Sequence, residues 1–260
     1  MVDVTIVLYA ICYLKRPFEH QSIQMKKLLL VLLTTVVLPA FAKTITATSW
    51  LVSDGDGKVL QSENIEEVRP IASISKLMTV MVVLDADQNP HTIIAGVTRE
   101  QRIMMALVKS DNNSAKLLCD YYPGGKTACV TAMNAKAQQL GMTHTHFIEA
   151  TGLSVFNVST AGELVKLVSA ASKYDYIKQA AASPSVKIRM KRRWLIFYNT
   201  NPIIGKRHNF LVSKTGYIHA SGGCIVMMLD TDVGRRIVVV LGSKNTHTRI
   251  PEAEFIAEAY

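Results

Sequence analysis

The hydrophobic pattern of this 260-residue chain separates early strands, a helical middle and late strands. Two β-rich runs, at 45–52 and 58–62, flank an Asp-Gly-Asp-Gly turn, which predicts a hairpin. Between about 75 and 140 the apolar positions recur with helical spacing. Several β-rich runs follow, most of them separated by glycine-bearing turns, and an amphipathic segment ends the chain. The expected late elements are strands over 187–198, 210–217, 223–230 and 235–241 and a helix over 250–260.

One helix is almost uninterrupted in its apolar character, at 77–84. Pro70 disfavours helix just before it, so this helix should begin near Ser73, run to about residue 85 and be buried on most faces. Other helices are expected over 100–108, 114–120, 127–140 and 160–172. Two of them begin with capping boxes: Thr98 with Gln101, and Ser159 or Thr160 with Glu163.

Residues 1–42 have the composition of an export signal. Met25 opens a basic segment, an apolar core follows at 28–38, and Ala-Phe-Ala at 40–42 is a cleavage signal. The apolar core is shorter than the about 20 residues that a transmembrane helix needs. We therefore expect a signal peptide cleaved before Lys43, translation from Met25, an upstream extension at 1–24 and a periplasmic mature protein. A buried N-terminal hairpin is the alternative.

The chain is basic, with a net charge of +9, or +7 once residues 1–42 and their charges are removed. A basic exported protein suits an anionic polymer or a membrane surface. The densest basic patch, at 187–193, alternates in its first half as a strand with one solvated face does. Nucleic-acid binding is not expected, because an exported chain rarely meets nucleic acid.

Three cysteines follow Lys43, so at least one thiol is unpaired. Cys119 and Cys129 are near enough in sequence to pair across a tight turn, whereas Cys224 lies in an apolar strand pattern typical of a core. The close pair of histidines at 144 and 146 has no further ligand beside it, which favours a surface loop over a zinc site. No metal or other cofactor is expected.

A nucleophile pattern begins at the buried helix. Ser73 stands three residues before Lys76, and residues at i and i+3 share one helix face, so the amine can reach the hydroxyl. A lysine can accept a serine proton if burial or a nearby cation lowers its pKa. Alone, however, this spacing is equally that of a helix cap beside a solvated lysine.

Two later motifs give the first one its meaning. Ser110 and Asn112 lie in a polar segment between two helices, which can hold side chains outward, although Ser, Asp and Asn caps are also common there. Lys214, Thr215 and Gly216 lie within a predicted strand. A glycine inside a strand often marks close approach of a ligand to the backbone, the alternative being a surface lysine near a strand end.

In order and rough spacing, the three motifs resemble those of penicillin-binding proteins and class A β-lactamases. Nearly all of 43–260 resembles the D-alanyl-D-alanine endopeptidases among the low-molecular-mass penicillin-binding proteins. The resemblance implies a single catalytic domain of mixed α/β (α+β) class: a five-stranded antiparallel sheet flanked by helices, with a helical subdomain at roughly 85–150. The segments that carry it, beyond the motifs, are 68–79, 122–125, 132–136 and 151–154.

The resemblance also implies catalytic roles. Ser73 would be the acylated nucleophile, Lys76 its general base, and Ser110 would relay a proton to the leaving amine. The oxyanion hole would consist of the backbone N–H groups of Ser73 and Tyr217.

Substrate binding is implied for the remaining motif residues. Asn112 would hold a substrate amide. Lys214 would keep Lys76 neutral through like-charge repulsion and would attract the substrate carboxylate, which Thr215 would bind beside Gly216.

The implied function is a serine DD-peptidase that cleaves D-Ala–diaminopimelate cross-links of peptidoglycan and is acylated by penicillins. A D-Ala–D-Ala carboxypeptidase is the alternative, because in both substrates a free carboxylate lies beside the leaving amine. A β-lactamase is disfavoured, since the Glu-x-x-Leu-Asn segment of class A is absent from the sequence. A non-catalytic penicillin- or peptidoglycan-binding module is favoured only by the segment at 85–102, which is shorter than in the family. Without the long C-terminal helix that anchors some relatives, at most peripheral membrane contact is expected.

Overall fold

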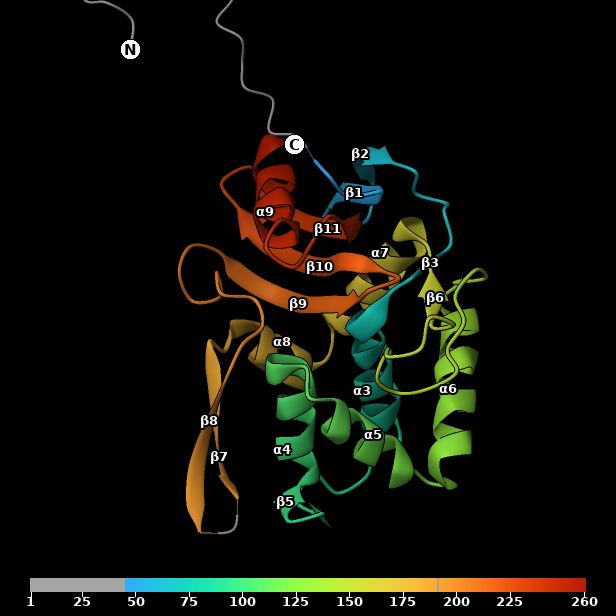
Figure 1. Ribbon diagram of the computed structural model, residues 1–260, viewed down its shortest axis with the longest axis vertical. Helices are drawn as coiled ribbons and strands as arrows, with labels where there is room; N and C mark the ends of the chain where they lie inside the picture. Colours follow the sequence, from blue (N-terminus) through green and yellow to red (C-terminus); the bar gives the residue numbers. More distant parts are fainter. Residues whose placement is uncertain (1–44, 191) are drawn as a thin grey trace, which may run out of the picture. The chain divides into compact units, whose positions relative to one another are not determined.

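A five-stranded antiparallel sheet forms the centre of the structure, a computed structural model that describes residues 45–190 and 192–260 (Figure 1). The strand order is β2-β1-β11-β10-β9, so the first strand of the chain pairs with the last. The expected sheet is confirmed, and the expected signal peptide at 1–42 lies outside the described residues. The strands are β1 (Ser49–Asp54), β2 (Val59–Glu63), β9 (Asn209–Ile218), β10 (Gly222–Thr231) and β11 (Gly234–Ser243).

Both faces of the sheet are covered, because alternate residues of its central strands are apolar on opposite faces. Val238 and Val240 of β11 pack on one face with Ile256 of α9 (Arg249–Ala259). Val239 and Leu241 face the opposite side and join the larger core cluster. That cluster includes residues of α3 (Ser75–Asp85) and α7 (Ala161–Ala171), which lie on the other side of the sheet from α9 in Figure 1.

The nucleophile segment folds as a 3-10 turn, η1 (Ala72–Ile74), that leads directly into α3. The first nine residues of α3 are all buried, which confirms the expectation of a helix enclosed on most faces. The turn itself is held on one side by the two-residue ladder of β3 (Arg69–Pro70) with β6 (Val158–Ser159).

The helical middle follows the expected order with two differences. The Thr98–Gln101 capping box is present, but the helix that it opens, α4 (Arg99–Met104), changes into a π-helical turn, η2 (Met105–Lys109). A two-residue ladder of β4 (Ile93–Ile94) with β5 (Val97–Thr98) precedes this helix. The ladder lies in the segment at 85–102, which the sequence analysis described as shorter than in the family. The remaining helices are α5 (Asn112–Asp120), α6 (Gly125–Gln139) and α8 (Asp175–Ala182), the last of which the sequence analysis missed.

The prediction of one strand over 187–198 is wrong. The segment is a hairpin of β7 (Ser185–Met190) and β8 (Arg193–Tyr198), with the basic run at its turn. Folding the segment back lets apolar residues of both halves, including Ile188 and Phe197, pack against Val97 and Met105. Burial of this shared apolar face explains why a hairpin forms instead of a single strand.

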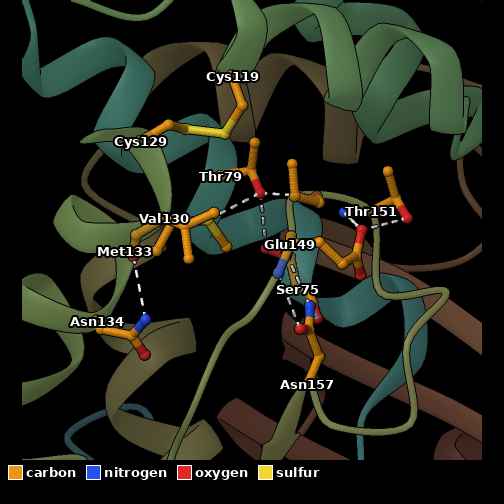
Figure 2. Close-up of a disulfide and its surroundings, with 11 residues drawn as sticks. Ser75, Thr79, Cys119, Cys129, Val130, Met133, Asn134, Glu149, Thr151 and Asn157 are labelled. Carbon is orange, nitrogen blue, oxygen red and sulfur yellow. Dashed lines mark hydrogen bonds between the residues drawn. A yellow bond between two sulfur atoms is a disulfide. The ribbon is translucent and has the colours of Figure 1, made fainter. Parts of the chain in front are cut away.

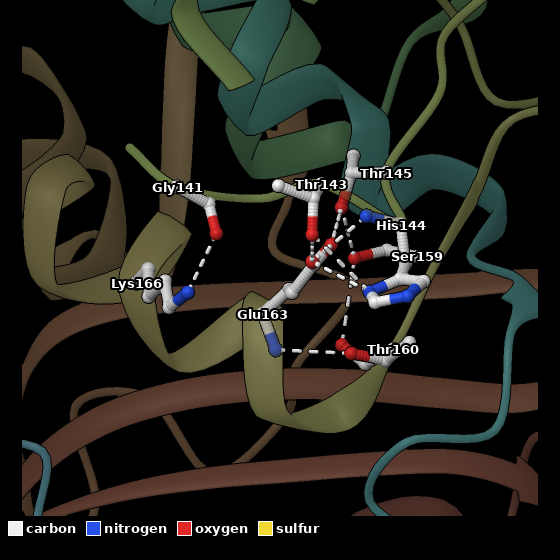
Figure 3. A network of polar contacts seen from close by, with 8 residues as sticks. All are labelled: Gly141, Thr143, His144, Thr145, Ser159, Thr160, Glu163 and Lys166. Carbon is white, nitrogen blue, oxygen red and sulfur yellow. Dashed lines mark hydrogen bonds and ion pairs between the residues drawn. The ribbon is translucent and has the colours of Figure 1, made fainter. Parts of the chain in front are cut away.

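A disulfide and a buried carboxylate connect segments of the helical region. Cys119 and Cys129 form a disulfide between α5 and α6, as the spacing suggested, and Cys224 is a buried free thiol. Thr160 caps α7, but Glu163 does not close the expected capping box. Its buried carboxylate instead accepts hydrogen bonds from Thr145 and from the backbone N–H of His144 (Figure 3). Within the described ranges, no helix is long and apolar enough to cross a membrane.

Candidate active site

The 3-10 turn η1 presents Ser73, half-buried, at the start of the apolar helix α3. The residue before it, Ala72, has φ +49°, a left-handed conformation that is unfavourable for a residue with a Cβ. This strain is held in place because Ala72 is fully buried and its carbonyl accepts a hydrogen bond from the Ser75 hydroxyl. The serine therefore projects from a rigid, strained turn.

Lys76 lies one helical turn further on and is completely buried. Its Nζ lies 2.7 Å from Ser73 Oγ, 2.8 Å from Asn112 Oδ1 and 2.6 Å from the carbonyl oxygen of Thr151. The last two atoms can only accept hydrogen bonds. A neutral amine has two N–H groups for these acceptors and one lone pair left for the Ser73 hydroxyl, which is the arrangement that a general base requires.

Burial lowers the pKa of Lys76 to about 8, against the opposing pull of the carboxylates of Glu149 and Asp111. The sequence analysis named two possible causes of a neutral Lys76, namely burial and like-charge repulsion from a nearby cation, for which the resemblance implied Lys214. The structure supports burial as the cause, because the Lys76 side chain is completely enclosed in the protein.

The second serine and second lysine form the other half of the site. Lys214 of β9 is 1% exposed, and its Nζ donates to Ser110 Oγ at 2.8 Å and to the carbonyl of Thr215 at 2.8 Å. Ser110 follows η2 with φ +60°, so it too stands on a left-handed backbone. The Thr215 hydroxyl donates to Thr200 Oγ1, 2.7 Å away.

Burial lowers the pKa of Lys214 well below that of a solvated lysine, and the positive charges of Lys76 and Arg249 lower it further. Arg249, the first residue of α9, was not singled out from the sequence. It is 8% exposed and donates from Nη1 to the carbonyl of Gly216 at 2.6 Å, which ties the motif strand to the last helix.

Gly216 brings strand β9 against the nucleophile turn. A Cβ at this position would lie 3.0 Å from the backbone nitrogen of Ser73 and 3.0 Å from the carbonyl oxygen of Ile71. Only glycine allows this approach without a shift of the backbone. Tyr217, the next residue, is thereby carried alongside the turn, with its ring exposed at the surface.

A loop after α6 completes the site and holds the residues that sequence reasoning missed (Figure 2). Glu149 accepts hydrogen bonds from the backbone N–H groups of Thr151 and Gly152, and this fixes the Thr151 carbonyl that meets Lys76. Buried Asn157 donates to the Ser75 hydroxyl and to the Glu149 carbonyl. Gly152 has φ +80°, and a Cβ there would lie 1.9 Å from the carbonyl oxygen of Ala72. The Thr-Gly-Leu-Ser segment at 151–154 was the available signal, but its pattern does not reveal these contacts.

The structure thus brings Ser73, Lys76 and Asn112 into one hydrogen-bonded group and Ser110, Lys214 and Thr215 into another, with Gly216 between strand and turn. A serine bonded to a buried lysine at the start of a helix, beside an antiparallel strand, defines a serine hydrolase site of the DD-peptidase class. The fold places the two groups on different elements: η1, α3 and α5 in one case, and β9 and the residue after η2 in the other.

Comparison with known proteins agrees. The sequence profile of the D-alanyl-D-alanine carboxypeptidase family (peptidase S11) matches residues 35–98 and 89–245. The chain is similar to the D-alanyl-D-alanine endopeptidase of Pseudomonas aeruginosa, with 36% identity over 83% of this chain and 77% of the relative. Its similarity to the endopeptidase of Escherichia coli is also 36%, over 85% and 77%. The chain therefore belongs to the peptidase S11 family of serine peptidases.

A solved structure supports the same conclusion. Penicillin-binding protein D2 of Listeria monocytogenes, in its cefotaxime-bound form, is 25% identical to the chain. The match has a TM-score of 0.71 and covers 81% of this chain and 95% of that one. The sequence-based prediction of the fold class and of a serine DD-peptidase is confirmed.

Proposed function

We propose that this protein is an exported endopeptidase that hydrolyses D-Ala–diaminopimelate cross-links in peptidoglycan and is acylated by β-lactams at Ser73. The names of its endopeptidase relatives and the β-lactam bound to the Listeria protein support this proposal. One observation carries the catalytic part of it: the Lys76 amine lies 2.7 Å from Ser73 Oγ, with two carbonyl acceptors occupying its N–H groups.

In the proposed first step, neutral Lys76 accepts the Ser73 proton while Oγ bonds to the carbonyl carbon of the D-Ala that precedes the scissile bond. The electron pair of the carbonyl moves to its oxygen, which the N–H groups of Ser73 and Tyr217 stabilise. Collapse of this intermediate breaks the C–N bond. The Ser110 hydroxyl passes its proton to the departing amine and is reprotonated from the Lys76 ammonium, which returns to the neutral form. Water then hydrolyses the acyl-enzyme and restores the free serine.

Substrate recognition rests on charge. Lys214 and Arg249 place buried basic groups at the motif strand, and Thr215 adds a hydroxyl. Both D-Ala–D-Ala and D-Ala–diaminopimelate carry a carboxylate beside the scissile amide, which such a strand can bind. Asn112, which already accepts from Lys76, would use its remaining amide donors for the peptide of the substrate.

Labelled penicillin tests the catalytic proposal. The purified protein should form a stable adduct, and Ser73→Ala should abolish it while circular dichroism and the melting temperature stay near those of the parent. Rapid turnover of penicillin would instead indicate a β-lactamase, and the absence of any adduct would indicate a binding module. Labelling that persisted in Ser73→Ala would refute the nucleophile assignment.

Digestion of purified sacculi tests the substrate. An endopeptidase converts cross-linked dimers to monomers, whereas a carboxypeptidase shortens pentapeptide stems to tetrapeptides without lowering cross-linkage. Separation of the muropeptides before and after treatment distinguishes the two. The Ser73→Ala protein is the control, because it keeps the binding surface and lacks the attacking oxygen.

Export to the periplasm is the third part of the proposal. It rests on the apolar core and the Ala-Phe-Ala signal before Lys43. Mass spectrometry of the protein recovered from a periplasmic extract should find Lys43 at its N-terminus. Retention of earlier residues in the exported form would count against this cleavage site.

A further inference from the structure

The β7–β8 hairpin has one face that the catalytic site does not use. Its strand register pairs Lys187 with Ile196 and Arg189 with Trp194, and side chains of directly paired residues lie on the same face of a ladder. Tyr198, two residues beyond Ile196, belongs to that face as well. We call these five residues, Lys187, Arg189, Trp194, Ile196 and Tyr198, the outer face of the hairpin.

The opposite face anchors the hairpin. Ile188 is fully buried, and Val186, Met190 and Phe197 pack with it against Val97 and Met105 of the helical region. Because strand side chains alternate, this anchoring holds the outer face toward solvent, and its apolar groups cannot turn inward without losing the packed face.

The outer face is apolar and cationic at once. Trp194, Ile196 and Tyr198 are 58%, 53% and 70% exposed, in a row along β8. Lys187 and Arg189 are exposed in the adjacent row along β7, and Arg192 and Arg193 follow at the turn and the start of β8. Solvent-facing rows of this kind add no packing to the protein, so they point to a ligand surface.

We propose that the outer face docks the protein on an anionic phospholipid surface. Tryptophan and tyrosine prefer the boundary between headgroups and acyl chains, where Ile196 would be buried beside them. Lysine and arginine bind the phosphates of the headgroups while their alkyl stems lie along the apolar layer. The positive net charge of residues 43–260, +7, favours the same partner.

A glycan strand is the other candidate, since sugars stack on aromatic rings. The Lys187 ammonium, however, lies over the Trp194 ring, 5.1 Å from its centroid. It occupies the ring face that a sugar would need, whereas at a membrane it can bind phosphate from the same position. Exposed Ile196 likewise has no function in sugar stacking. The observations therefore favour lipid, and this docking does not depend on which bond the active site cleaves.

Co-sedimentation with vesicles tests the proposal, with protein recovered after export. Vesicles of phosphatidylethanolamine and phosphatidylglycerol should bind the protein at low salt, and vesicles of phosphatidylcholine alone should bind it much less. Lys187→Ser with Arg189→Ser should lower the partition coefficient about 30-fold, which corresponds to about 2 kcal/mol at about 1 kcal/mol for each cation. Trp194→Ala with Tyr198→Ala should lower it about tenfold or more.

The controls remove the same net charge, or an aromatic ring, at other positions on the surface. Lys58→Ser with Lys173→Ser removes two exposed lysines elsewhere on the surface, and Tyr121→Ala removes an exposed aromatic ring. These variants should bind vesicles nearly as the parent does, and all variants should keep penicillin labelling, which verifies the fold. Equal loss in control and hairpin variants, or no binding to anionic vesicles, would overturn the proposal. Hairpin-dependent binding to purified sacculi without binding to vesicles would overturn it too and assign the face to glycan.

Discussion

Raising the pH should accelerate penicillin acylation of Ser73 along a curve that Lys76 sets. Only the neutral amine can accept the serine proton, and burial lowers the pKa of Lys76 to about 8. At pH 7 about 9% of molecules then carry the neutral base, compared with about 0.03% for a solvated lysine. The net lowering of the pKa therefore raises the competent fraction about 300-fold, which corresponds to about 3 kcal/mol.

The curve follows from this pKa. The acylation rate should rise about ninefold between pH 6 and 7, about fivefold between pH 7 and 8, and only about twofold from pH 8 to 10. With a solvated lysine the last interval would give about a 75-fold rise. Stopped-time labelling with a fluorescent penicillin measures the rate, at times short enough to avoid alkaline hydrolysis of the reagent. A rate that keeps climbing steeply above pH 8 would refute the lowered pKa, and a flat profile would refute Lys76 as the base.

Removing a nearby negative charge tests the direction in which carboxylates shift the pKa of Lys76. The Asp111 carboxylate raises the pKa of Lys76, so Asp111→Asn should move the midpoint of the curve to lower pH. Asparagine still caps α5, where the Asp111 side chain accepts from the Ser114 N–H at 2.7 Å. Asp120→Asn, at the other end of the same helix, removes an equal charge that pairs with Lys116 and should leave the midpoint unchanged. A midpoint that moved upward in Asp111→Asn would contradict the electrostatic account.

Three further outcomes follow from the structure. Gly152→Ala should abolish labelling and cost more than about 3 kcal/mol of unfolding free energy, because its Cβ would collide with a backbone oxygen at 1.9 Å. Gly96→Ala, also at positive φ but with open space around it, should cost only about 1 kcal/mol by the same urea titration. Lys76→Met should raise stability relative to the parent most at pH 7. Above pH 8 the folded parent loses the Lys76 proton more readily than the unfolded chain does, because the pKa of Lys76 is lower in the folded state. The unfolding free energy of the parent should therefore rise with pH there, by up to about 3 kcal/mol relative to Lys76→Met. Replacing both Cys119 and Cys129 by alanine should lower the unfolding free energy by about 3 kcal/mol, with labelling retained in the folded protein; a loss of labelling without a loss of stability would contradict this.

The sequence predicted the scaffold and the motif residues because their signals are local. Apolar periodicity identified α3 and the late strands, and the Thr98–Gln101 capping box formed as its spacing implied. The hairpin at 185–198 was misread because a strand and its return have the same alternation, and only the packing of Ile188 and Phe197 on a distant partner decides where the chain turns.

The missed parts of the site depend on contacts between distant segments. Glu149 and Asn157 act by fixing a loop whose Thr151 carbonyl meets Lys76, and nothing in their own neighbourhood marks that function. Glu163 was placed in a capping box by its spacing, yet Thr145 and His144 offered its carboxylate stronger partners from another loop. Burial was named from the sequence as one cause of a lowered Lys76 pKa, but its extent could not be predicted, because it is a property of the whole core.

The pairing of the first strand with the last one determines when the molecule can assemble. Strand β1 pairs with β11 over its whole length, so the interior of the sheet cannot close until residue 243 has been synthesised. The clamp of Arg249 on Gly216 comes later still. A chain that crosses a membrane from its N-terminus would thus reach the far side with its nucleophile turn lacking the strand and helix that complete it. For a protein exported as proposed above, acylation competence would then arise only after nearly the whole chain has been delivered, and so only outside the compartment of synthesis.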